Sequence, residues 1–165
     1  MPKFNPFNKG RVFVVNESIV SSTLAAILRR QDFAVTAFTD GMNALRAART
    51  EPPDLLITDM AMSPLSGIDL ALRLRKRCPS CKVLFFSGQS GSAESLGIAR
   101  SNGLEFELIP EPVDPTELIK KVRDVTEAAS CAAAKDRALK TYNDNARETL
   151  SQLQAGSPLH FSRMK

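Results

Sequence analysis

The feature that most constrains the fold is a regular alternation between short apolar runs and segments with helical spacing. The apolar runs are rich in Val, Ile, Leu and Phe, which is typical of buried strands, and the segments between them place apolar residues three or four apart. The expected strands are residues 11–15, 33–38, 53–59, 82–88 and 105–110, and the expected helices are residues 18–30, 40–49, 67–77, 92–103 and 114–125. Strand and helix repeated five times predict an α/β fold, with a doubly wound five-stranded parallel sheet.

Several helix ends carry their own signals. Asp40 and Asp114 are suited to the N-cap position, and Pro115 is suited to the first helical turn. Gly103 is placed to end the helix before the fifth strand. These local signals support the predicted boundaries.

The carboxyl ends of the strands are the expected ligand-binding edge of such a sheet. The residues predicted there are Asn16, Glu17, Asp59, Ser87 and Glu111. No G-x-G-x-x-G or Walker A sequence follows the first strand, so dinucleotide binding and P-loop chemistry are not expected. The one histidine, His160, is remote in sequence, so no Ser-His-Asp set is available and no independent enzyme activity toward a metabolite is expected.

Residues 10–127 resemble the receiver domain of two-component response regulators. The strongest part of the resemblance is PDLLITDMAMSPLSGIDL (53–70), in which Gly67 follows Asp59 by eight residues, as in that family. VLFFSGQS (83–90) is similar to the family's fourth strand with its terminal hydroxyl residue. The resemblance implies the flavodoxin-like, receiver-type version of the doubly wound fold.

The resemblance also implies a role for each residue at the sheet edge. Asp59 matches the phosphoacceptor, and Ser87 matches the hydroxyl that contacts the phosphoryl group. Asn16 and Glu17 match the acid pair that holds Mg²⁺, together with Asp59 and the carbonyl of Ala61. The implied partner is a sensor histidine kinase or another signalling protein, and the implied role is phosphorelay signal transduction through protein–protein contacts.

The sequence departs from the family's pattern in three places: the acid pair, the lysine position and the position of the switching aromatic residue. Asn16 replaces a carboxylate, and Glu17 keeps the charge but reaches one methylene further, so the sequence predicts a weakened Mg²⁺ site. Glu111 stands where the family has a lysine. Together, Asn16 and Glu111 change the formal charge of the site from −2, for three acids and one lysine, to −3, for Glu17, Asp59 and Glu111. Leu108 stands where a switching aromatic residue is common, and it cannot act as an aromatic switch.

These departures leave two interpretations of the function open. In one, Asp59 is phosphorylated and the chain is a switch. In the other, the chain is a pseudo-receiver that is not phosphorylated and works as a constitutive binding or dimerisation module. Glu111 itself has three interpretations: it repels the phosphoryl group, it replaces the lost metal ligand, or its side chain stays in solvent.

Residues 128–154 are predicted to form a C-terminal helical extension, followed by a flexible tail at 155–165. The extension contains neither Pro nor Gly and has an apolar stripe of Ala129, Ala132, Leu139, Tyr142, Ala146, Leu150 and Leu153. The stripe has two interpretations, packing on its own domain or forming a homodimer or partner helix. Residues 128–165 are too few for a winged helix, so no DNA-binding domain is expected.

Composition limits the remaining possibilities. No apolar run is long enough to span a bilayer and no signal peptide is recognisable, so a cytoplasmic protein that does not enter a membrane is expected. The net charge is +4, and the basic excess lies in residues 128–165 without a tight cluster, which is weak support for nucleic-acid binding. Cys78 and Cys81 have the spacing of a redox pair or of half a zinc site, but they follow an expected helix and precede a strand, so a loop with two thiols is favoured.

Overall fold

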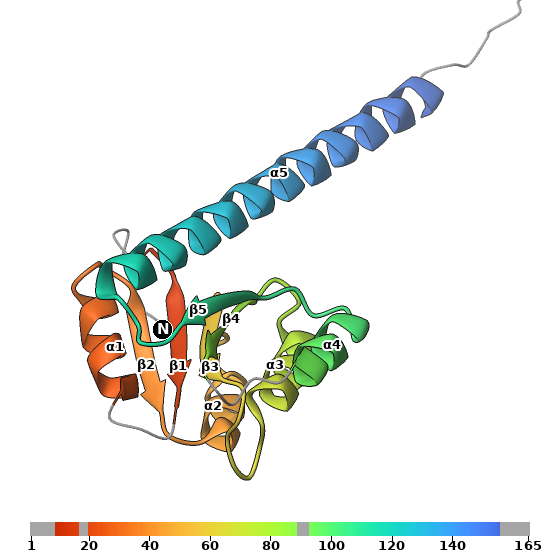
Figure 1. The fold of residues 1–165 in the computed structure, drawn as a ribbon. Coiled ribbons are helices and arrows are strands. Elements are labelled where there is room, and N and C mark those ends of the chain that lie inside the picture. The colour runs from red at the N-terminus through yellow and green to blue at the C-terminus, as the bar shows by residue number, and fades with distance from the viewer. Residues whose placement is uncertain (1–8, 17–19, 89–92, 156–165) are drawn as a thin grey trace, which may run out of the picture. The chain divides into compact units, whose positions relative to one another are not determined.

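The computed structural model describes residues 9–16, 20–88 and 93–155. The strands are β1 (Arg11–Val15), β2 (Ala34–Phe38), β3 (Leu55–Asp59), β4 (Lys82–Ser87) and β5 (Glu107–Pro110). The helices are α1 (Val20–Arg29), α2 (Gly41–Ala47), α3 (Gly67–Arg77), α4 (Ala93–Ser101) and α5 (Pro115–Ala155). All strand pairings are parallel, and the sheet order is β2-β1-β3-β4-β5 (Figure 1). The predicted doubly wound fold is confirmed.

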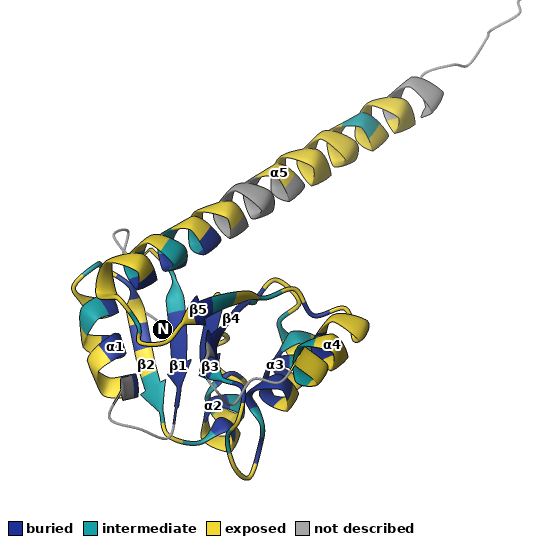
Figure 2. Cartoon of the chain, viewed as in Figure 1, coloured by how far each residue is buried: buried dark blue, intermediate teal, exposed yellow. Residues whose placement is uncertain are grey.

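The two faces of the sheet support two separate hydrophobic clusters. Successive strand side chains point to opposite faces, so Phe85 joins the cluster covered by α2, α3 and α4, while its neighbour Phe86 joins the cluster covered by α1 and the start of α5. Phe13 and Val14 divide in the same way. Figure 2 shows the buried residues concentrated in the central strands β1, β3 and β4. Because helices cover both faces of the sheet, the side chains on both sides of these strands are buried, and the strand sequences are therefore continuously apolar.

The predicted helix signals are confirmed at three ends. The side chain of Asp40 accepts a hydrogen bond from the N–H of Met42 at 2.8 Å. Asp114 caps α5 by accepting from two backbone N–H groups, at 2.8 and 3.0 Å. Gly103 has a φ of 71°, a conformation that a residue with a Cβ rarely adopts. Helix α4 ends at Ser101, earlier than predicted, because Asn102 and Gly103 form the turn.

The chain divides into two compact units, residues 1–129 and 130–165. The boundary lies two residues beyond the predicted end of the receiver-like domain, and α5 contributes residues to both units. In the first unit, α5 places Leu118, Val122 and Val125 in the hydrophobic core. In the second unit, the side chains of Leu139, Tyr142 and Leu150 are exposed, and Ala146 is half-buried. The predicted flexible tail lies outside the described residues from position 156 onward.

The Cys78–Cys81 segment forms the turn between α3 and β4, and both cysteines are free thiols. The N–H of Cys81 donates to the carbonyl of Cys78 at 3.0 Å. Burial raises the pKa of Cys81 to about 12, and burial also raises the pKa of Cys78, with Arg77 acting in the opposite direction. Raised pKa values disfavour the thiolate that redox chemistry and zinc binding need, which supports the loop interpretation.

Candidate functional site

Asp59 is the last residue of β3, the middle strand of the sheet, and its side chain is half-buried. The other four residues of β3 are fully buried, and Thr58 is the only polar one among them. Burial of Leu55, Leu56 and Ile57 in the core therefore fixes where the strand ends. The N–H of Ala61 donates to Oδ1 of Asp59 at 3.3 Å. The carboxylate is therefore held over the first turn of the loop that follows β3.

The sheet register places the other predicted site residues around Asp59. Val15 pairs with Thr58, so Asn16 follows at the level of Asp59 on one side. On the other side, Asp59 pairs with Phe86 of β4, and Ser87 is the next residue. Ser87 in turn pairs with Pro110 of β5, which Glu111 follows. The ends of four strands meet at this edge. Glu17 and the side chain of Ser87 lie outside what the structure describes.

Gly67 closes the loop against the end of β3. Its N–H donates to the carbonyl of Met60 at 3.0 Å. A Cβ at this position would overlap the carbonyl oxygen of Asp59 and would lie 2.9 Å from the carbonyl carbon. Only glycine fits this approach, so the spacing between Asp59 and Gly67 noted in the sequence has a steric cause.

Two residues that support the site were not predicted from the sequence. Ser66 is the N-cap of α3: its hydroxyl accepts from the N–H of Asp69 at 3.1 Å and donates to the Asp69 carboxylate at 2.7 Å. A Ser followed three residues later by an acid is a capping signal, so this role was readable. Thr58 is fully buried, and its hydroxyl donates to the carbonyl of Asp59 at 3.1 Å. No local pattern distinguishes Thr58 from other strand residues.

Leu108 on β5 and Glu111 just after it, the two departures in this part of the chain, occupy different surroundings. Glu111 is exposed just after the strand, and the peptide bond between Glu111 and Pro112 is cis. Leu108 is half-buried and packs against the hydrophobic cluster on the α2–α3–α4 face of the sheet. Position 108 is therefore part of the packing, and position 111 faces solvent.

The residues at this edge offer few charged ligands for a metal ion. Within residues 9–16, 20–88 and 93–155, no group of three or more His, Cys, Asp or Glu is close enough to hold one. The candidate donors at this edge are the Asp59 carboxylate, the side-chain amide of Asn16, which is 8% exposed and follows the strand at the level of Asp59, and the backbone carbonyl of Ala61, two residues after Asp59. All are oxygen donors, which suit a hard cation such as Mg²⁺, and only one of them carries a charge.

A parallel sheet of order 2-1-3-4-5 with an acid at the end of its central strand defines a receiver-like α/β domain. Comparison with known families supports this class directly, because the model of the response regulator receiver domain matches residues 12–123. The chain therefore belongs to the response regulator receiver domain family, and this confirms the predicted place in two-component signal transduction.

Curated relatives are similar over the same region. The transcriptional regulatory protein CreB of Escherichia coli is 31% identical over 113 residues, which cover 67% of this chain and 47% of CreB. The response regulator receiver protein CpdR of Brucella abortus is 27% identical over 106 residues, which cover 64% of this chain and 87% of CpdR. The chain spans about half the length of the first curated relatives that it matches.

Solved structures share the fold. The chemotaxis protein CheY4 of Vibrio cholerae superposes with a TM-score of 0.63 at 22% identity, covering 70% of this chain and 97% of that structure. The regulator described as AraC from Clostridium phytofermentans superposes with a TM-score of 0.64 at 26% identity, covering 76% and 98%. Separately, the helices among the described residues include none that is long and apolar enough to cross a membrane.

Proposed function

We propose that this chain acts in phosphorelay signalling, with Asp59 as the phosphoacceptor and changed protein–protein contacts as the output. One observation carries the proposal: the Asp59 carboxylate lies at the end of the central strand, where the ends of β1, β4 and β5 meet. A carboxylate there is a nucleophile for a phosphoryl group presented by a sensor histidine kinase or another signalling protein. No activity toward a metabolite is part of the proposal.

The transfer step needs little chemistry from the rest of the chain. An oxygen of Asp59 forms the bond to phosphorus while the bond to the donor nitrogen breaks, and the electron pair of that bond leaves with the donor. The N–H of Ala61, which donates to Oδ1 in the structure, holds the carboxylate in place. The hydroxyl of Ser87, at the end of the neighbouring strand, is the proposed contact for the transferred group.

The Mg²⁺ site of the proposal is weak. Asp59, the carbonyl of Ala61, Asn16 and Glu17 would hold the ion. When bound, the ion would neutralise negative charge on the carboxylate and the phosphoryl oxygens. Asn16 offers an amide oxygen in place of a carboxylate, so this set attracts the ion less strongly than two acids would.

Glu111 makes the site degenerate in this proposal. With Glu17, Asp59 and Glu111 the formal charge is −3, and no lysine stands at the end of β5 to offset a phosphoryl group. The exposed position of Glu111 favours the interpretation in which its side chain stays in solvent over the one in which it replaces a metal ligand. Slow phosphorylation is expected because the site has no cation at the end of β5, even when the Glu111 side chain stays in solvent.

A constitutive binding module is the second candidate. Leu108 favours it, because a leucine that packs against the core has no aromatic ring or hydroxyl to move in response to phosphorylation. The exposed stripe of Leu139, Tyr142 and Leu150 in the second unit adds a surface through which such a module would form a homodimer.

Measuring the intact mass of the protein after incubation with acetyl phosphate and Mg²⁺ distinguishes the phosphorylated switch from the constitutive binding module. The proposal expects a slow gain of one phosphoryl group in the wild-type protein and no gain in Asp59→Asn. An equal gain in both proteins would place the modification elsewhere. Absence of any gain, with a known receiver domain phosphorylated in parallel, would leave the constitutive binding module as the function.

A further inference from the structure

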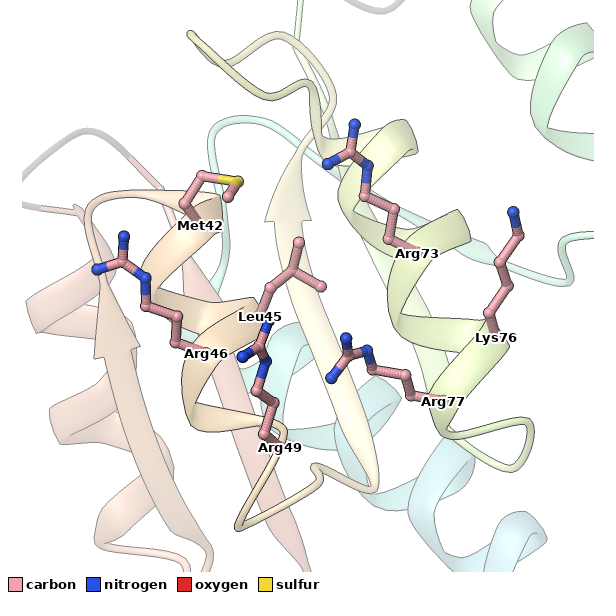
Figure 3. A pocket seen from close by; sticks show the side chains of 7 residues that line it. All are labelled: Met42, Leu45, Arg46, Arg49, Arg73, Lys76 and Arg77. Carbon is pink, nitrogen blue, oxygen red and sulfur yellow. The ribbon is translucent and has the colours of Figure 1, made fainter.

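A pocket lined mainly by cations lies between α2 and α3, and none of the predicted phosphoacceptor-site residues lines it. Its volume is about 310 Å³. Figure 3 shows the seven side chains that line it, which project from α2 and the turn after it on one side and from α3 on the other. Five of the seven are basic: Arg46, Arg49, Arg73, Lys76 and Arg77. No acid lines the pocket.

The cations form two facing stripes. Arg46 and Arg49 are three residues apart, and Arg73, Lys76 and Arg77 follow the three- and four-residue spacing of one helix face. Like charges at this spacing repel each other. Figure 3 shows Arg77 reaching from α3 toward α2, and the Arg49 side chain running alongside Leu45 on the other side of the pocket. The arrangement concentrates positive charge in a domain that, over residues 1–127, holds 16 Lys or Arg and 15 Asp or Glu in total.

The protein itself does little to neutralise this charge. All five cations are exposed, and among the described residues none of them forms an ion pair. Arg46 has a long hydrogen bond of 3.5 Å to the amide of Asn43. Asp69, one turn before Arg73, is hydrogen-bonded to Ser66. The negative end of a helix dipole stabilises basic residues near the helix C-terminus, but this effect does not require them to face one another across a pocket.

The pocket also has an apolar side. Leu45 is half-buried and packs against the core, and Met42 is 38% exposed. No aromatic side chain lines the pocket, so it lacks the stacking platform that single-stranded nucleic acids use. Arginine and methionine are enriched at protein interfaces, and a guanidinium binds a carboxylate with two parallel hydrogen bonds. Cationic edges around an apolar floor are complementary to an acidic segment that also carries apolar side chains.

We propose that the α2–α3 pocket is a docking site for an acidic, amphipathic segment of another protein. The segment's carboxylates pair with Arg49, Arg77 and Arg73, and an apolar side chain rests on Leu45 and Met42. The site is separate from the Asp59 edge, so the proposal stands whether or not Asp59 is phosphorylated. It gives the chain a partner surface on the opposite side of the sheet from α1 and the start of α5.

Fluorescence anisotropy with a synthetic peptide tests this proposal. The probe is a short labelled helix-forming peptide with Glu on one face and Leu on the other, and its matched control has Gln in place of every Glu. The full chain is expected to bind the acidic peptide, to bind the Gln peptide about tenfold more weakly or worse, and to lose affinity as salt is added. Equal binding of the two peptides, or binding of neither, overturns the proposal.

Variants locate the site. Arg49→Glu with Arg77→Glu is expected to weaken binding of the acidic peptide about tenfold or more. The matched control, Arg30→Glu with Lys120→Glu, makes the same change in net charge at exposed positions outside the pocket and is expected to leave binding nearly unchanged. Circular dichroism checks that both variants are folded. Equal loss in the two variants would show attraction to net charge alone and overturn the proposal.

A competition experiment separates the partner classes. A single-stranded DNA oligonucleotide and vesicles containing phosphatidylglycerol are added to the peptide complex. Weak competition by both, compared with unlabelled acidic peptide, is the expected result. Tighter binding of either one through Arg49 and Arg77 would assign the pocket to nucleic acid or to a lipid surface, and would overturn the protein-segment proposal.

Discussion

The Cα of Gly67 lies against the backbone carbonyl of Asp59, so closely that a Cβ at position 67 would overlap the carbonyl oxygen. This contact joins the start of α3 to the end of the central strand. The N–H of Gly67 also donates to Met60. The loop between β3 and α3 is therefore closed at both of its ends. The Ala61 N–H in this loop donates to the Asp59 carboxylate, so the position of the carboxylate depends on the closed loop.

Gly67→Ala is accordingly expected to be strongly destabilising. The added methyl group meets backbone atoms, which cannot rotate away, so the free energy of unfolding should fall by about 3 kcal/mol. Urea unfolding measures this change. Gly97→Ala in α4 is the matched control, because a Cβ there meets nothing within 4 Å. Helix propensity predicts that the control gains up to about 1 kcal/mol. Similar losses in both variants would contradict the steric explanation.

The charge at the end of β5 is expected to limit phosphorylation of Asp59. Glu111→Lys combined with Asn16→Asp restores a cation for the phosphoryl group and a carboxylate for the metal, so the rate of phosphoryl incorporation from acetyl phosphate should rise about tenfold or more. Intact mass over time measures the rate. Glu51→Lys, which makes the same charge change as Glu111→Lys at an exposed position before β3, is combined with Asn16→Asp as the control. If the double variant is as slow as wild type, the assignment of these positions is wrong.

The two thiols in the turn before β4 should react at different rates. Cys81 is buried and its pKa is raised to about 12, while Cys78 is half-buried and its pKa is raised less strongly. Because the thiolate is the nucleophile, iodoacetamide at neutral pH should modify Cys78 well before Cys81. Peptide mass spectrometry of a time course reports both sites. Equal rates in the folded protein would contradict the burial of Cys81, and equal rates after addition of urea are the expected control.

The cap of α5 predicts a dependence of stability on pH. Hydrogen bonds from the N–H groups of Glu117 and Thr116 lower the pKa of Asp114 below its usual value of 3.8. A carboxyl group whose pKa is lowered by folding contributes stability above its unfolded pKa and loses that contribution as the pH falls through its folded pKa. The melting temperature of wild type should therefore exceed that of Asp114→Asn at about pH 5, and the difference should shrink toward about pH 3.

Asp144→Asn is the control for that experiment, since Asp144 is exposed in the second unit. It should leave the melting temperature close to that of wild type over the same range. A difference between wild type and Asp114→Asn that stays constant as the pH falls would show that the charge of Asp114 contributes nothing to the cap.

The apolar stripe of the second unit predicts self-association. Leu139, Tyr142 and Leu150 lie on one stripe and are exposed, and burying them against a second copy would remove apolar surface from water. Sedimentation should give the mass of a dimer for the full chain, and the mass of a monomer for a shortened protein that ends at Ala128. Leu139→Ser with Leu150→Ser should also give a monomer. Equal monomeric masses for the full and shortened chains would exclude the homodimer.

The sequence alone determined the order of strands and helices, the caps at Asp40 and Asp114, and the glycine at 103. These features depend on periodicity and on hydrogen bonds between residues a few positions apart, which a sequence displays directly. It also indicated that residues 16, 59, 87 and 111 would share an edge, because parallel strands end on the same side of a sheet. The exact ends of the elements were less certain, as β5 shows by beginning at Glu107.

Only the tertiary structure decided which strands are neighbours, and therefore that Asn16 and Phe86 flank the position of Asp59. It also decided that Gly67 meets the carbonyl of Asp59, and that Arg49 and Arg77 line one pocket. Apart from Gly67 and Asp59, which one loop joins, these pairs are separated along the chain by whole strands or helices. Their proximity follows from the packing of the helices on the sheet, which depends on the hydrophobic core as a whole and leaves no local mark in the sequence.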